Sequence, residues 1–155
     1  MKITLDIERY KELLEKEKCL SQQSNSLVFE DRDEFIELLS YAASVQDQIS
    51  YERREEYYSL ISRYIEKVVI SSVFECEFLE MEKEDGKAAT MITNDFKQLA
   101  VFSVDLRALK FSSLTTKIYD VCMLALEFGE EGISDQKSHK SVEKTYFEMR
   151  KFLKK

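Results

Sequence analysis

Carboxylates are the side chains most able to do chemistry in this sequence, and they are clustered. Six acids and one base, Lys83, lie between residues 75 and 85, and five acids with no base lie between residues 120 and 135. A third group sets five acids against Arg32 in residues 30–37, whereas residues 137–155 carry seven basic and two acidic side chains. Fixed negative charge of this density can imitate RNA phosphates and occupy the basic cleft of a nuclease. The same pattern is typical of a solvated helix face.

We take the two larger acidic clusters as the candidate partner-binding surface. Its acids are Glu75, Glu77, Glu80, Glu82, Glu84, Asp85, Asp120, Glu127, Glu130, Glu131 and Asp135. Tyr58 is added, because it falls off the apolar stripe of its helix and tyrosine is favoured at the centre of interfaces. Catalysis by these carboxylates is not expected, since pairs on a hydrophilic ridge lack the burial that acid–base chemistry requires.

Other catalytic or cofactor sites are not predicted. His139 is the only histidine and is expected at the surface, so neither a di-iron nor a zinc site can be assembled. The glycines, Gly86, Gly129 and Gly132, form no phosphate-binding loop. The cysteines, Cys19, Cys76 and Cys122, are widely spaced and are expected to be buried, reduced thiols. We therefore expect no catalytic residues, no metal and no cofactor.

The net charge limits the class of partner. At −7 it disfavours nucleic acid and anionic membranes and favours a basic protein. A charged residue, Asp6, interrupts the N-terminal segment early, and no apolar run approaches the roughly 20 residues that a membrane span requires. The expectation is a soluble cytoplasmic protein that is not exported.

The elements that must position these acids are predicted to be helices. The sequence has no proline and three glycines, which favours long helices over tight turns. We expect one all-α domain over residues 1–155, a bundle of about six helices. Residues 50–155 would form a four-helix core unit, and residues 1–49 a helical extension packed against it.

The apolar periodicity places the individual helices. The predicted elements are Leu5–Cys19, Asp31–Ser44, a hairpin over Tyr57–Asp85, a very hydrophobic helix from Ser112 or Ser113 to Phe128 or Gly129, and a last helix from about Ser138 to Leu153. Ser50 is expected to cap the helix that follows it. A capping box of Ser72 and Glu75 would begin the second half of the hairpin, and Gly86 would end it.

The sequence pattern of residues 88–111 is ambiguous between helix and strand. Phe96, Leu99 and Phe102 suit a helix, whereas residues 100–106 taken alone suit a strand. A helix is favoured, because a single strand would have no partner.

The predicted hairpin also carries a family resemblance. The segments Tyr57-Tyr-Ser-Leu-Ile-Ser-Arg-Tyr-Ile-Glu66 and Ile70-Ser-Ser-Val-Phe-Glu-Cys-Glu-Phe-Leu-Glu-Met-Glu-Lys-Glu-Asp85 resemble the bacterial self-protective, colicin D-type immunity proteins. The likeness continues loosely through Ile118–Cys122 and Val142–Leu153, so it covers roughly two thirds of the chain. It rests on patterns of apolar and acidic residues.

The resemblance implies a small, acidic, helical inhibitor of a tRNA-cleaving toxin. The protein would bind the basic nuclease domain of a cognate toxin and occlude its active-site cleft with the acidic clusters. The alternative from the residues is an acidic helical adaptor or regulatory scaffold that binds a host protein through an apolar groove. Residues 1–49 lie outside the resemblance and could be decoration or could themselves hold the partner.

Overall fold

The computed structural model describes the backbone of residues 1–132 and 135–155 and the side chains of residues 1–127 and 136–155. It is 83% helical, which confirms the all-α prediction. Eight helices are present in the described residues, two more than expected. They are α1 (Ile7–Gln22), α2 (Leu27–Glu30), α3 (Arg32–Glu52), α4 (Arg54–Ile65), α5 (Ser71–Thr93), α6 (Phe96–Val101), α7 (Leu106–Gly132) and α8 (Asp135–Leu153), with strands β1 (Lys2–Thr4) and β2 (Ser103–Asp105).

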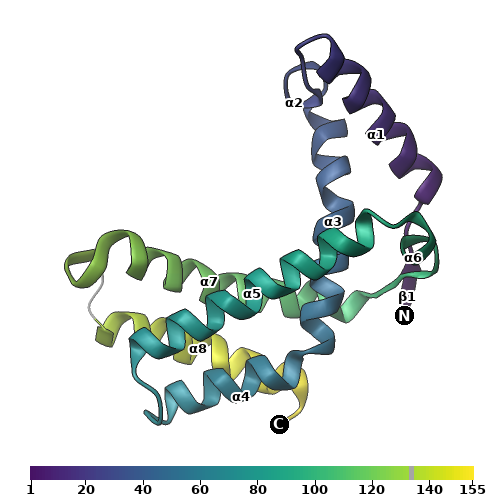
Figure 1. Cartoon of the computed structure of the whole chain (residues 1–155). Coiled ribbons are helices and arrows are strands. Elements are labelled where there is room, and N and C mark those ends of the chain that lie inside the picture. Colours follow the sequence, from purple (N-terminus) through teal and green to yellow (C-terminus); the bar gives the residue numbers. More distant parts are fainter. Residues whose placement is uncertain (133–134) are drawn as a thin grey trace.

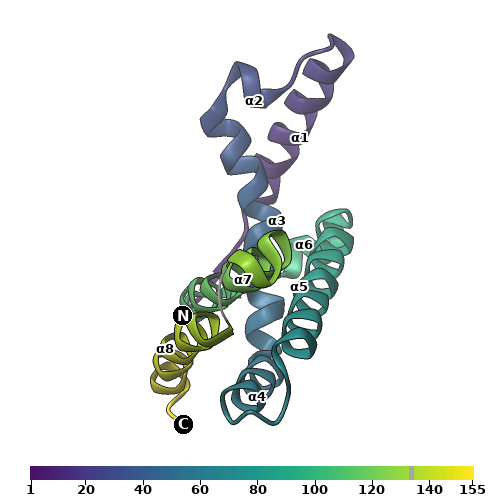
Figure 2. The same cartoon turned by 90° about the vertical axis from the view of Figure 1, so that its left-hand side faces the viewer.

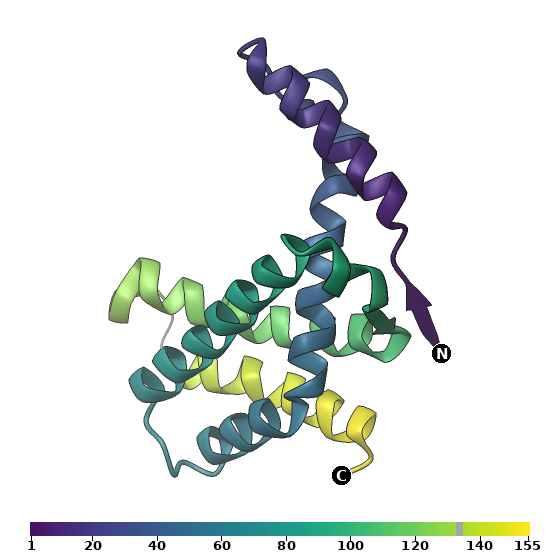
Figure 3. The same cartoon turned by 45° about the vertical axis from the view of Figure 1, so that its right-hand side comes forward.

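The molecule has a helical body and a projecting arm (Figure 1). The arm consists of α1, α2 and the first half of α3, and it stands away from the body in all three views (Figures 1, 2 and 3). The body contains α4, α5, α7, α8 and the second half of α3, which packs against both α5 and α7. There are two apolar clusters. One, around Tyr10, Leu13 and Val45, joins the arm to Ala89 of α5 and Leu99 of α6, and the other, around Tyr57, Phe78 and Ile118, lies within the body.

Helix α3 is continuous where the sequence suggested a break. It begins at the predicted cap, where the Asp31 carboxylate accepts the Glu34 N–H at 3.1 Å. Val45 and Ile49 keep the helical spacing, and the helix runs on to Glu52. Ser50 is buried inside it and caps nothing, which corrects the prediction. The boundary predicted at residue 50 therefore falls within one helix that joins arm and body.

Helix α5 is longer than predicted at both ends. It starts at Ser71, and its N-cap residue Ile70 supplies no side-chain hydrogen bond, so the Ser72 capping box is wrong. Gly86 does not end the helix, which continues for another seven residues to Thr93. A Cβ at Gly86 would lie 3.6 Å from Oε1 of Gln46 on α3, an ordinary contact. The glycine is thus tolerated inside the helix rather than required for a turn.

In residues 88–111 the expected helix is present as α6, but the expectation that the segment contains no strand is wrong. β2 pairs antiparallel with β1, with Ile3 opposite Val104. The pairing partner that a local sequence pattern could not supply is β1, which lies about a hundred residues earlier in the chain. Directly after β2, the Asp105 carboxylate accepts the Arg107 N–H at 2.9 Å, and α7 begins at Leu106 rather than at Ser112 or Ser113.

The predicted core residues of the hairpin are buried. Tyr57, Tyr64, Phe74 and Phe78 all lie in the body cluster, and the rings of Tyr64 and Phe74 stack with centroids 4.2 Å apart. Helix α7 is less enclosed than its composition suggested, because Leu126 is 61% exposed. Of the cysteines, Cys122 is buried as predicted, whereas the other two, Cys19 and Cys76, are exposed.

A buried carboxylate connects three helices of the body. Asp85 on α5 is 1% exposed, although the sequence placed it on the acidic surface. It accepts hydrogen bonds from Ser50 Oγ on α3 at 2.7 Å, from Tyr57 OH on α4 at 2.6 Å and from Arg53 Nη1, between these helices, at 2.7 Å. A buried charge persists only with such donors, so these bonds fix the packing of α3 and α4 on α5.

Removing one donor should weaken the fold. We expect Tyr57→Phe to lower the free energy of unfolding by about 1–3 kcal/mol, because a buried carboxylate oxygen loses its partner while the ring stays in place. Urea denaturation measures the change. Tyr119→Phe is the matched control, since the Tyr119 hydroxyl takes part in no hydrogen bond with a described residue, and its effect should stay within about 0.5 kcal/mol. Equal effects of the two changes would contradict the role given to Asp85.

Candidate functional site

The acids of residues 75–85 lie on several different sides of α5. Glu77 and Glu84 lie on the side of α5 that faces α4, and each pairs with an arginine, Arg63 at 3.3 Å and Arg53 at 3.2 Å. Exposed pairs of this kind leave little net field for a partner. Asp85 points inward and is inaccessible. The continuous acidic ridge predicted from the sequence is therefore not formed.

Glu80 and Glu75 take the remaining positions outside the groove described next. Glu80 is exposed, 3.8 Å from Lys83 one turn along the helix. Glu75 is half-buried near α7, where burial, and then the charge of Glu75, raise the pKa of the Cys122 thiol to about 12. Its position shows that the acidic segment of α5 lies along α7.

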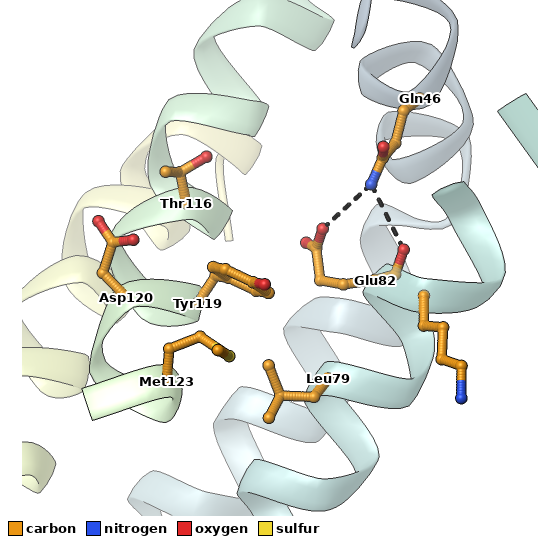
Figure 4. Close-up of a pocket in the computed structure, with 8 residues that line it drawn as sticks. Gln46, Leu79, Glu82, Thr116, Tyr119, Asp120 and Met123 are labelled. Carbon is orange, nitrogen blue, oxygen red and sulfur yellow. Dashed lines mark hydrogen bonds between the residues drawn. The ribbon is translucent and has the colours of Figure 1, made fainter. Parts of the chain in front are cut away.

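A groove between α3, α5 and α7 brings the two predicted acidic clusters together. Its volume is about 680 Å³, and its lining comprises Gln46, Leu79, Glu82, Lys83, Thr116, Tyr119, Asp120 and Met123. In Figure 4, Tyr119 and Met123 of α7 lie opposite Glu82 and Leu79 of α5, and Asp120 lies further out on α7. We call this feature the α5–α7 groove. It combines apolar side chains with one carboxylate from α5 and one from α7, and its lining also includes Lys83 of α5.

Glu82 is the electrostatically unusual residue of the α5–α7 groove. Burial, and then the nearby charges of Asp85 and Asp47, raise its pKa to about 7. Gln46 Nε2 donates to the Glu82 carbonyl at 3.3 Å and to its carboxylate at 3.4 Å, which compensates only part of the lost hydration. Burial raises the pKa of Asp47 as well. No cation in the described side chains lies within ion-pair distance of the Glu82 carboxylate.

The α7 wall carries the rest of the second cluster that the structure describes. Asp120 and Glu127 are both exposed and are seven residues apart, so they lie on one face of the helix two turns from each other. Thr116 and Met123 of the groove belong to the same face. The other predicted acids, Glu130, Glu131 and Asp135, lie outside the residues whose side chains are described.

Tyr58 is less available than the sequence suggested. Its ring stacks on Tyr146 of α8 with centroids 5.4 Å apart, and the two hydroxyl oxygens are 3.1 Å from each other. The Lys155 amine lies over the Tyr58 ring, 5.4 Å from its centroid. Tyr58 therefore serves to pack α4 against α8.

The site contains residues that sequence reasoning missed. Gln46 was hidden because its helix was expected to end at Ser44, and Tyr119 because it falls off the apolar stripe of α7. The available signal was that Tyr119 lies outside the apolar stripe of α7 and directly precedes an acid, Asp120, which is a pattern expected at a binding surface. Within the described residues, no group of three or more His, Cys, Asp or Glu side chains is arranged to hold a metal ion. None of the helices in those residues has the length and apolar character that crossing a membrane demands.

Comparison with models of protein families, with curated proteins and with solved structures finds no match to this chain. The resemblance to immunity proteins thus stays a prediction from the residues.

The raised pKa of Glu82 makes a prediction for stability against pH. Between the ordinary value of 4.5 and about 7, the unfolded chain loses the Glu82 proton while the folded chain keeps it. Folding therefore becomes less favourable as pH rises through this window. We expect Glu82→Gln, which resembles the protonated acid, to gain roughly 2 kcal/mol in unfolding free energy over the wild type on going from pH 5 to pH 8.

Urea denaturation of both proteins at the two pH values provides the measurement. Glu80→Gln is the matched control, because it removes the same charge from the exposed side of the same helix and so measures the effect of charge loss alone. A difference for Glu82→Gln that changes with pH no more than that of the control would show that Glu82 is hydrated and that the groove is more open than described.

Proposed function

We propose that the protein is a cytoplasmic immunity protein that binds the basic nuclease domain of a cognate toxin, a tRNase, and blocks its active-site cleft. The single observation that carries this proposal is the α5–α7 groove, where Glu82 and Asp120 from the two acidic clusters line one cavity. Neither forms an ion pair with a described side chain, and Lys83, the lysine of the lining, lies 3.8 Å from Glu80 instead. The family resemblance of residues 57–85 adds the identity of the partner. The protein acts by binding and catalyses no reaction.

The groove suits a lysine or arginine side chain of the partner. The aliphatic part of such a side chain can pack on Leu79 and Met123, while its charged end reaches Glu82 and Asp120. A desolvated carboxylate without a cation is unfavourable in the free protein, and the incoming charge removes that penalty. Nucleases that bind RNA expose such cations in their clefts, because the substrate carries one charge per nucleotide.

Charge on the surrounding surface would speed the encounter. Glu127 extends the α7 wall of the groove, and the net charge of −7 attracts a basic domain over long range. Complementary fields raise association rates to roughly 10⁸–10⁹ M⁻¹s⁻¹ at low salt. An inhibitor that protects its own cell from an active nuclease benefits from this speed.

Neutralising the groove acids should weaken the complex. The partner is first sought as a basic nuclease domain encoded directly upstream of the gene for this chain. Its affinity is then measured by calorimetry at about 50 and 300 mM salt. We expect the triple change Glu82→Gln, Asp120→Asn and Glu127→Gln to raise Kd at least about tenfold at low salt and to flatten the salt dependence. Protection of cells that express the toxin should fall in parallel.

A control triple removes the same charge elsewhere: Glu15→Gln and Asp33→Asn on the arm and Glu66→Gln after α4, all exposed in the structure. It should leave affinity within about twofold of the wild type once long-range charge is screened. If the control triple loses more affinity than the groove triple, the interface lies outside the groove, and the arm becomes the candidate surface. A wild-type affinity that does not respond to salt would favour the adaptor alternative, in which the apolar side chains of the groove hold the partner.

A further inference from the structure

A second cavity lies on the body, at the junction of α4, α5 and α8. It measures about 530 Å³, within the range of small-molecule sites. Residues from the α4–α5 connection, from the start of α5 and from the second turn of α8 surround it, among them Lys67, Ser71, His139, Lys140 and Glu143. In contrast to the α5–α7 groove, its charged lining is mainly basic. We call it the α5–α8 cavity.

Two lysines give the α5–α8 cavity its charge. Lys67 and Lys140 come from segments 73 residues apart, and within the described side chains neither is paired with a carboxylate. The backbone of Lys67 is held in the left-handed region, with φ of 59°, where a glycine is usual at a helix end. The Lys67 N–H donates a hydrogen bond to Tyr64 O at 3.0 Å, and the Val68 N–H donates one to Arg63 O at 2.8 Å. The Lys67 side chain therefore starts from a backbone position that these hydrogen bonds fix.

The start of α5 adds backbone donors to the same cavity. Ile70 provides no side-chain acceptor at the N-cap, and the first turn of α5 contains no acid. The N–H groups of this turn have no partner within the helix, and the helix dipole makes its N-terminus positive. An anion beside Ser71 would receive these hydrogen bonds together with that of the Ser71 hydroxyl.

His139 contributes an unsatisfied polar atom. The sequence placed it at the surface, but the residue is half-buried, with its ring 5.2 Å from that of Tyr64. Its Nε2 is shielded from solvent and has no hydrogen-bond partner in the described residues. A buried polar atom without a partner is unfavourable, and a ligand oxygen reached by a small rotation of the ring would satisfy it.

The remaining acid, Glu143, narrows the class of ligand. A carboxylate in the lining disfavours a bare anion but can accept hydrogen bonds from hydroxyl groups attached to one. The net charge of −7 and the neighbouring acidic groove oppose a polyanion such as RNA, whereas a small ligand feels mainly the local cations. The lining therefore fits one anionic group at the lysine side and hydroxyls at the Glu143 side.

We propose that the α5–α8 cavity binds the phosphate monoester of a small hydroxylated molecule, with the phosphate between Lys67, Lys140 and the start of α5 and the hydroxyls at Glu143. Four kinds of donor belong to the lining of this one cavity: two amines, backbone N–H groups, a hydroxyl and an imidazole. Such a set of donors matches a group with several acceptor oxygens and two negative charges.

The experiment uses the single histidine as its reporter. Proton NMR of the full chain follows the His139 ring signals during titration with ribose 5-phosphate, inorganic phosphate and ribose. We expect a saturable shift with ribose 5-phosphate, binding of inorganic phosphate at least about tenfold weaker, and no shift with ribose. Equal affinity for inorganic phosphate would overturn the assignment to an ester, and no saturation with any of the three would overturn the site.

Variants separate local contacts from general charge. Lys67→Gln combined with Lys140→Gln should weaken the binding of ribose 5-phosphate at least about tenfold. Both lysine side chains are exposed, so the double variant should keep the fold. The matched control, Lys144→Gln with Lys151→Gln, removes the same charge from exposed positions on α8 outside the cavity. Equal weakening by both pairs would overturn the proposal. Glu143→Gln should reduce the ratio between the Kd of inorganic phosphate and the Kd of ribose 5-phosphate. An unchanged ratio would contradict the role of Glu143.

Discussion

The burial of one carboxylate governs the architecture of the body. Asp85 lies inside the protein with donors from Ser50, Arg53 and Tyr57, which belong to the end of α3, the junction and the start of α4. An ionised group at this depth is tolerated only when its hydrogen-bonding positions are filled, so these segments have little freedom to move relative to α5. The interaction is directional, unlike the apolar contacts around it, and it selects one packing among those that the hydrophobic core alone would allow.

The same constraint creates the candidate site. Glu82 precedes Asp85 by three residues and so lies on a neighbouring part of the helix surface. With Asp85 fixed inside, Glu82 is held at the edge of the core, where water reaches it only in part and its pKa rises to about 7. Asp47 of α3 adds a third acid to the region, whereas Arg53 is already engaged by Asp85. Local imbalance of this kind is expected where a protein is built to bind rather than to be maximally stable.

Sequence periodicity predicted most of the helices and the body core, because those features depend on residues close together in the chain. Asp85 was misplaced although a signal existed: Phe74, Phe78, Met81 and Asp85 follow steps of four, three and four, so the acid falls on the buried stripe. Its charge alone indicates exposure, whereas its position on the stripe indicates burial, and the structure shows that it is buried. The strand β2 could not be predicted locally, because its partner β1 lies about a hundred residues earlier. The α5–α7 groove required the relative placement of three helices, which no local pattern contains.

Helix α5 presents opposite charge at two points along its length. Its uncapped start contributes positive potential to the α5–α8 cavity, and its acidic middle contributes Glu82 to the α5–α7 groove. Eleven residues separate Ser71 from Glu82, or about 16 Å along a helix, which exceeds the screening length of about 8 Å at physiological salt. Ligands of opposite charge at the two proposed sites would therefore interact only weakly with each other through the solvent. Any coupling between them has to pass through the position of α5 itself, and the bonds of Asp85 keep that position fixed.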